Sequence, residues 1–154
     1  MSSLDALAAA GVGIASALLP VINAEAYLGV TGLAAPSAVF TVALALALGQ
    51  TAGKVVLFEG AKRSALLAAR RREPQHRRPR FGASVTLRLT TLLRRPWLGG
   101  VTVLVSASAG VPPLAVVSVL AGHTGVHRAV FIPACLLGRI ARFMLIAIPI
   151  VAAT

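Results

Sequence analysis

The sequence predicts an all-α integral membrane protein of one domain. We expect two inverted repeats, each a re-entrant helical hairpin followed by a transmembrane helix. The first observation is composition: of the 154 residues, 57% are hydrophobic and 12% are charged. Soluble domains are about 45–50% apolar and about 25% charged, so few polar residues remain here to cover a core. The second is the uneven placement of the net charge of +11. Together they exclude an ordinary soluble enzyme and a disordered basic tail.

The positive charge is concentrated between residues 62 and 95. This segment contains 11 of the 15 lysines and arginines and one of the four acidic residues, so its net charge is +10. Basic residues of membrane proteins collect in short cytoplasmic loops. This predicts a multi-pass protein of the cell (plasma) membrane with the 62–95 loop in the cytoplasm and anionic lipid headgroups as its partners. Nucleic acid is not expected, because no pattern of aromatic side chains accompanies the arginines.

The end of this loop predicts a short helix lying in the membrane interface. Val85, Leu89 and Leu93 share one face of a helix over residues 83–95, and Arg88 lies on the opposite face. Two prolines interrupt any helix earlier in the loop. The loop therefore joins the two apolar halves through one amphipathic element.

The first repeat, residues 6–61, begins with an apolar run that is too short to cross a membrane. Fourteen residues, 6–19, precede Pro20, whereas a spanning helix needs about 20. Asn23 and Glu25 follow at once, as expected for a re-entrant hairpin with a polar tip. Residues 36–60 then read as a transmembrane helix.

The second repeat, residues 96–154, has the same order of features. Residues 97–120 are long enough to span, but Gly110, Pro112 and Pro113 lie near the middle. Proline breaks a helix there and frees backbone groups that need new partners. We expect a second re-entrant hairpin, and a proline-kinked span over 97–120 stays open as an alternative. Residues 128–152 read as the second transmembrane helix.

The two halves also resemble each other weakly in sequence. With the basic loop inside, the first span runs inward and the second runs outward. This is the inverted-repeat topology of many transporters. Residues 31–32, 38–40 and 48–54 align with residues 121–122, 129–131 and 137–142.

Small residues and prolines are expected to shape the hairpins and let helices pack closely. Glycines four residues apart, as in 49–53, permit close approach of two membrane helices, and they also leave a homo-oligomer open. The expected packing positions are Pro20, Gly49, Gly53, Pro112, Pro113, Gly122 and Gly138.

Four ionisable residues within the apolar halves are candidates for a substrate site: Glu25, Lys54, Arg139 and Arg142. An ionisable side chain at membrane depth is costly, which makes it a functional candidate. The two arginines are three residues apart and share a helix face, and arginine suits phosphate geometry. Simpler interpretations stay open. Glu25 lies in water at the outer interface, the arginines bind backbone carbonyls at the hairpin tips, or Lys54 extends to the interface.

The other polar residues favour neither catalysis nor metal binding. Glu59 is expected to pair with Lys62 and Arg63, which stand at i+3 and i+4. His123 and His127 have metal-ligand spacing, but no third ligand is near them in sequence. No acidic residue accompanies the serines of the second half. We therefore expect no enzyme, no metal and no cofactor.

Five short motifs occur in a fixed order along residues 14–148, outside the basic loop. They are Leu18-Leu19-Pro20-x-x-Asn23-Ala24-Glu25, Gly49-Gln50-Thr51-Ala52-Gly53 with Gly60, Gly110-Val111-Pro112-Pro113, Ala121-Gly122, and Gly138-Arg139-x-x-Arg142-Phe143.

In these motifs the chain resembles the DedA family, also called the VTT-domain or SNARE-associated Golgi protein family, and within it the small YqaA-like branch. The resemblance implies two facing re-entrant hairpins and the transport of lipids. By position, Glu25 matches the family's acid after the first proline, and Arg139 and Arg142 match the motif of its last span. Lys54 stands where many members have an acid, and Gly60 is followed by alanine rather than arginine. This departure weighs against the proton coupling inferred for the family.

The expected function is therefore lipid transport of the flippase or scramblase type. The substrate is a phosphate-bearing lipid such as polyprenyl phosphate or a phospholipid, bound by Arg139 and Arg142 with Glu25 and Lys54. The alternative is a non-transporting membrane scaffold or anchor whose basic loop recruits anionic lipids or a partner.

Overall fold

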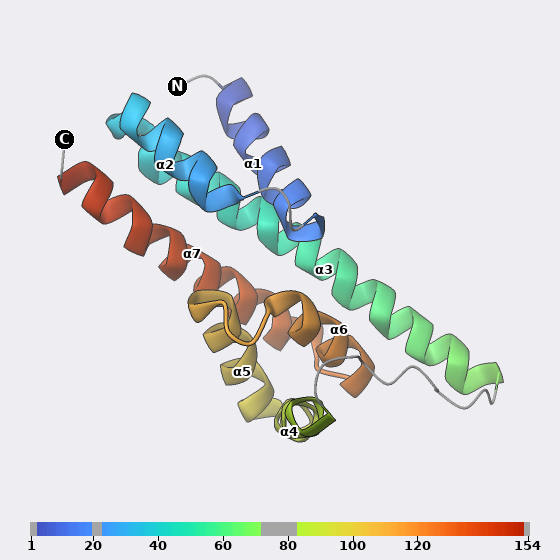
Figure 1. The fold of residues 1–154 in the computed structure, drawn as a ribbon. Helices are drawn as coiled ribbons and strands as arrows, with labels where there is room; N and C mark the ends of the chain where they lie inside the picture. Colours follow the sequence, from blue (N-terminus) through green and yellow to red (C-terminus); the bar gives the residue numbers. More distant parts are fainter. Residues whose placement is uncertain (1–2, 20–22, 72–82, 153–154) are drawn as a thin grey trace.

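The two longest helices, α3 (Val39–Arg71) and α7 (Arg128–Ala152), lie antiparallel to each other, and the shorter helices pack around them (Figure 1). The computed structural model describes residues 3–19, 23–71 and 83–152, and every regular element in these ranges is a helix. By length and composition, α3 with the residues just before it and α7 could each cross a membrane. The all-helical prediction is therefore confirmed for the part of the chain that is described.

The first hairpin consists of α1 (Ser3–Leu18) and α2 (Ala24–Ala34). Helix α1 packs on α3, and α2 packs on α7 and on the start of α3. Asn23 caps α2, because its side-chain oxygen accepts hydrogen bonds from the backbone N–H of Glu25 at 2.9 Å and of the next residue at 3.3 Å. A single 3₁₀ turn, η1 (Pro36–Ala38), leads into α3.

The second hairpin consists of α5 (Pro96–Ala109) and α6 (Leu114–Thr124). Gly110 ends α5 with φ of 77°, a left-handed conformation that glycine adopts without strain. The Val111–Pro112 peptide bond is cis, and the Ser106 hydroxyl donates to the Pro112 carbonyl at 2.5 Å. Residues 96–124 thus form two helices separated by a turn, and not the kinked continuous helix that the sequence left open.

Glycines allow each hairpin to lie directly against a long helix. A Cβ atom added at Gly49 of α3 would overlap the carbonyl oxygen of Ala10 in α1. A Cβ at Gly138 of α7 would lie 2.7 Å from the carbonyl oxygen of Leu104 in α5. Such distances are far below ordinary van der Waals contact, so backbone approaches backbone at both places. Gly53 and Gly122 make similar close contacts, with α1 and with α3 itself.

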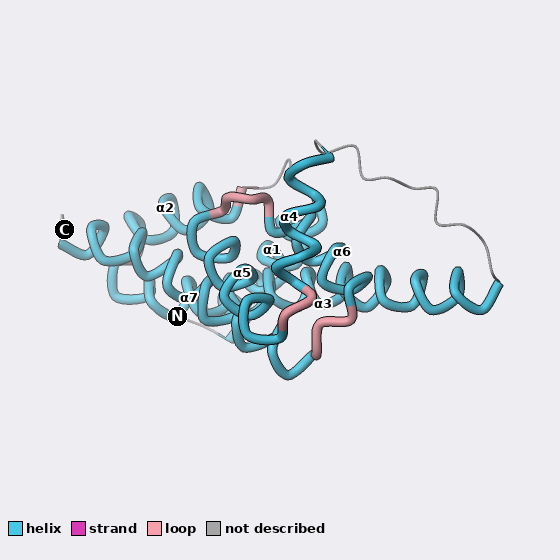
Figure 2. The backbone as a smooth tube through the Cα atoms, turned by 90° about the horizontal axis from the view of Figure 1, so that it is seen from below, coloured by secondary structure: helices cyan, strands magenta, loops and turns pink. Residues whose placement is uncertain are grey.

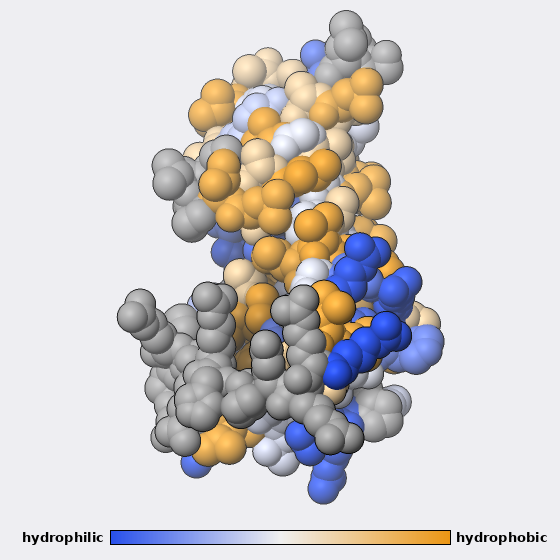
Figure 3. All heavy atoms as spheres, turned by 90° about the vertical axis from the view of Figure 1, so that its right-hand side faces the viewer, coloured by the Kyte–Doolittle hydropathy of each residue, from blue (hydrophilic) through white to orange (hydrophobic). Residues whose placement is uncertain are grey.

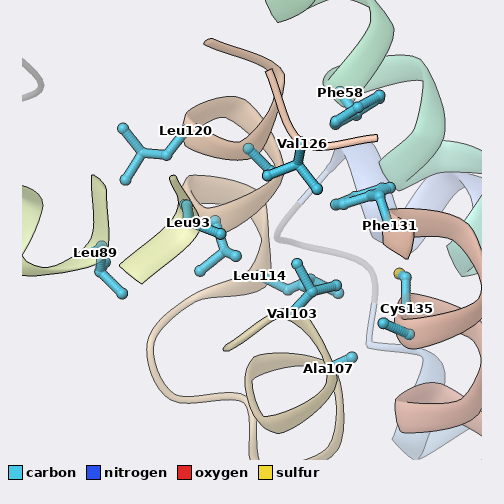
Figure 4. Close-up of a cluster of buried hydrophobic side chains, with 13 residues drawn as sticks. Phe58, Leu89, Leu93, Val103, Ala107, Leu114, Leu120, Val126, Phe131 and Cys135 are labelled. Atoms are coloured by element: carbon cyan, nitrogen blue, oxygen red, sulfur yellow. The ribbon is translucent and has the colours of Figure 1, made fainter. Parts of the chain in front are cut away.

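One apolar core joins the second hairpin to the middle of the long helices (Figure 4). Phe58 of α3 and Phe131 of α7 stack with ring centroids 4.4 Å apart, and Val103 and Leu114 pack beside them. The amphipathic helix α4 (Ala83–Leu93) adds the buried Leu89 and Leu93.

A second core cluster joins the first hairpin to the other half of the long helices. Its largest fully buried side chains are Leu28 of α2, Leu46 of α3 and Phe143 of α7. The two clusters occupy successive stretches of α3 and α7, with a polar region between them.

Helix α3 runs beyond the span expected from the sequence. We predicted a helix over 36–60 and a loop from residue 62, but the helix continues to Arg71. Figures 1 and 2 both show this end of α3 projecting past the other helices. The prediction was wrong because residues 61–71 are mostly alanine, leucine, lysine and arginine, which favour helix despite their charge.

Polar and apolar surfaces are separated along the molecule. In Figure 3 most of the apolar surface lies in the upper part, and most of the strongly hydrophilic residues lie in the lower half. Arg70, Arg88 and Arg94 are among the exposed basic residues. Pro20 and residues 72–82 of the predicted basic loop lie outside the described residues.

Candidate functional site

The start of α2 and the end of α5 both contact Arg142 of α7, between the two apolar clusters. The carboxylate of Glu25, in the first turn of α2, accepts from Nε of Arg142 at 2.6 Å and from Nη2 at 2.5 Å. Their side chains are 38% and 26% exposed. Glu25 also sits where the positive end of the α2 dipole favours a carboxylate. The ion pair therefore ties the first hairpin to α7.

Arg142 also meets the tip of the second hairpin. Its Nη1 donates to the Ser108 carbonyl at 3.5 Å. A Cβ atom at Gly110 would overlap the same Nη1, so the end of the Arg142 side chain would have to shift, and the left-handed backbone conformation there favours glycine in any case. Arg142 thus lies against both tips, and one of the interpretations left open, a bond to a tip carbonyl, holds for this arginine.

Lys54 is buried under α1 in the middle of α3. Its side chain is 5% exposed, and Nζ donates to the Ala17 carbonyl at 2.5 Å, in the last turn of α1. The expectation that Lys54 extends to the interface was wrong, because Gly53 lets α1 approach closely enough to cover it. A charged group is therefore enclosed where helix α1 ends.

Arg139 lies one turn before Arg142 on α7 and has no ion-pair partner among the described residues. Its Nε is buried, and the N–H of this atom finds no hydrogen-bond acceptor among the described residues. It is close enough to Lys54, Glu25 and Arg142 for the charges to interact. Of the two arginines, only Arg142 forms the ion pair with Glu25.

Gln50 is a member of this site that the sequence analysis did not single out. Its side chain is 7% exposed, and Nε2 donates to the Ser16 hydroxyl oxygen at 2.9 Å. The amide oxygen Oε1 is buried and has no donor among the described residues. The signal in the sequence was its position four residues before Lys54, which places two polar side chains on one face of an apolar helix.

The site as a whole is cationic. Lys54, Arg139 and Arg142 face a single carboxylate, that of Glu25, so the cluster carries a net charge of +2. Guanidinium and ammonium groups have only N–H donors, which phosphate and carboxylate oxygens accept. The arrangement can therefore hold an anion. Within the described ranges no group of three or more His, Cys, Asp or Glu is placed to bind a metal ion.

Other polar pairs lie at the far end of the second hairpin. Glu59 accepts from Nε of Arg128 at 2.7 Å, which joins α3 to α7. The predicted pairing of Glu59 with Lys62 and Arg63 was wrong, and Nζ of Lys62 lies 5.9 Å from the centre of the Phe58 ring instead. These contacts stabilise the packing and lie outside the cationic cluster.

Comparison with known proteins identifies no relative: no family model, no curated protein and no solved structure matches the chain.

Proposed function

We propose that the protein spans a membrane and moves a phosphate-bearing lipid between its leaflets. The observation that carries this proposal is the net charge of +2 in the cluster of Glu25, Lys54, Arg139 and Arg142, which lies along α3 and α7 between the two apolar clusters. Charged groups at membrane depth mark substrate pathways. A lipid phosphate would bind Arg139, whose Nε has no partner in the part of the chain that is described, and Arg142 once it leaves Glu25.

The architecture supports transport rather than a fixed anchor. We propose that α3 and α7 cross the bilayer and that the hairpins α1–α2 and α5–α6 enter from opposite sides. On this interpretation α1 with α3, and α5 with α7, form the two inverted repeats, and Gly49 and Gly138 hold equivalent packing positions. Broken helices meeting at the midplane of such repeats form the binding sites of many transporters. The resemblance to the DedA family stays a prediction that agrees with this proposal.

Labelling of engineered cysteines tests the proposed membrane placement. Cysteines at Trp97 and His123, in a Cys135→Ala background, lie near the two ends of the second hairpin, and both positions are exposed. A membrane-impermeant thiol reagent should reach both from the cytoplasmic side. Labelling of the two positions from opposite sides would contradict re-entry of the second hairpin.

Translocation of a labelled lipid phosphate in proteoliposomes tests the function itself. Arg139→Ala and Arg142→Ala should each reduce the rate, whereas Arg128→Ala on the same helix should not, because Arg128 pairs with Glu59 outside the cluster. Unchanged translocation in both cluster variants would refute the proposed role of the arginines.

A second candidate is a membrane scaffold without transport, favoured by the contacts of Arg142 with both hairpin tips. In that case the charges hold the hairpins together. Removing them would then lower stability and expression with no separate effect on lipid movement. The basic residues around 62–95 would in either case bind anionic headgroups of the cytoplasmic leaflet.

A further inference from the structure

Two buried polar atoms without partners lie at one level of the contact between α3 and α7. Phe58 stacks on Phe131, and Lys54 lies near Cys135, one turn further along. One turn further along each of these antiparallel helices, Gln50 of α3 lies opposite Arg139 of α7. These are the residues whose Oε1 and Nε have no hydrogen-bonding partner among the described residues.

The orientation of the Gln50 amide is determined by Ser16. The Ser16 hydroxyl donates its only proton to the Gly13 carbonyl at 2.9 Å. Its oxygen can therefore only accept from Gln50, so Nε2 must face Ser16. Oε1 consequently stays an acceptor that is turned away from Ser16, and it needs an O–H or N–H donor from elsewhere.

Buried donors and one buried acceptor are thus left without partners at the same level of the α3–α7 contact, among the described residues. Nε of Arg139 offers a donor, and so does the ammonium of Lys54, which has one acceptor among the described residues for its three N–H groups. Oε1 of Gln50 offers an acceptor. The oxygens of a fully deprotonated anion can accept from the cations, but one of them would also face Oε1 of Gln50. Two acceptor oxygens in contact repel each other. An oxyanion that retains one proton satisfies both sides.

We propose that Gln50 selects a protonated oxyanion, with the O–H of a phosphate donating to Oε1 and its other oxygens accepting from Arg139 and Lys54. This inference rests on the anion site of the proposed function and assigns to Gln50 the recognition of the proton. The same chemistry is present in free inorganic phosphate and in a terminal lipid phosphate. A phosphodiester ionised at neutral pH lacks the O–H group.

Sulfate provides the matched probe, because it has the shape and size of phosphate and carries no proton at neutral pH. Radiolabelled inorganic phosphate is bound to the purified full chain in detergent and displaced with unlabelled phosphate or sulfate. Leaving one buried acceptor without a donor corresponds to a loss of about 10- to 100-fold in affinity. We therefore expect unlabelled phosphate to displace the label at a concentration about 10- to 100-fold lower than sulfate does.

The variant Gln50→Met keeps the length of the side chain and removes the acceptor. Phosphate and sulfate should then compete within about threefold of each other. Thr51→Val is the matched control, since Thr51 is the next residue, is also buried, and donates its hydroxyl proton to the Ala47 carbonyl at 2.8 Å. It should keep the wild-type preference. Circular dichroism verifies that each variant is folded.

Equal binding of phosphate and sulfate by the wild type, or no saturable binding of either, would overturn the inference. So would a preference that survives Gln50→Met, or one that is lost equally in Thr51→Val. The lipid assay separates the two proposals. Lipid translocation without selectivity for phosphate over sulfate would support the transport function and refute the recognition by Gln50. Selective phosphate binding without lipid translocation would support the recognition by Gln50 and refute the transport function.

Discussion

Replacement of Gly49 by alanine should loosen α1 from α3. The added Cβ would lie 2.9 Å from the carbonyl carbon of Ala10, besides overlapping its oxygen. Ordinary contact starts near 3.4 Å, so the two backbones must separate by at least about 0.5 Å. Overpacking of this kind costs about 1–3 kcal/mol. The hydrogen bond from Lys54 to the last turn of α1 should lengthen with it.

Gly60→Ala is the matched control on the same helix. Gly60 is exposed and a Cβ there would meet nothing within 4 Å, so alanine only adds helix propensity, about 1 kcal/mol. The propensity gain is common to both variants and cancels between them. The difference between their free energies of unfolding should therefore be the overpacking cost of about 1–3 kcal/mol.

Thermal unfolding in detergent, followed by circular dichroism, measures this difference. For a chain of this size each kcal/mol shifts Tm by about 2–4 °C, so Gly49→Ala should melt well below Gly60→Ala. An equal or higher Tm for Gly49→Ala would refute the direct packing of α1 on the backbone of α3.

Three further predictions concern the ion pair, the aromatic stack and the second hairpin. Glu25→Gln should lower the free energy of unfolding by about 1 kcal/mol, because its partner Arg142 is partly solvated; a chemical-unfolding series should show the loss shrinking at high salt. Phe58→Ala should cost about 3–5 kcal/mol through loss of the buried stack on Phe131, and a Tm near that of the wild type would contradict the stack. Ser106→Ala should cost about 1–2 kcal/mol, since it removes a buried bond to the turn, and proteolysis near residue 111 should then become faster.

Features set by local sequence were predictable. The helix over 128–152 follows from a long apolar stretch that only Arg139 and Arg142 interrupt, and the turn after Ala109 follows from Gly110 with two prolines. The end of α3 was not predicted correctly. Over residues 61–71 the positive charge suggests a loop and the helix propensity suggests a helix, and the prediction gave more weight to the charge. In this segment the propensity of alanine and leucine prevails.

Pairings between distant residues were not predictable in detail. Glu59 finds Arg128 across the α3–α7 contact and not the lysine and arginine in its own next turn. The depth of Lys54 depends on how closely α1 approaches, which glycine contacts decide. Composition identified the rare charges of the apolar halves, but the choice of Arg142 over Arg139 as the partner of Glu25 required the tertiary structure.

In the proposed membrane placement, the projecting end of α3 would determine how far its charges stand from the bilayer. At about 1.5 Å per residue, 33 residues extend about 50 Å, whereas the hydrocarbon core is about 30 Å thick. If the helix enters the core at Val39, its last dozen residues reach about 18 Å beyond it. The headgroup layer takes up about 5–7 Å of this distance, so the end of the helix stands about 12 Å outside the headgroups, which is more than one physiological screening length of about 8 Å. Lys62 would then lie at the headgroups, while the attraction between Arg70 and the headgroups would be weaker and would grow as α3 tilts, so the strength of this attraction would report the tilt of the helix.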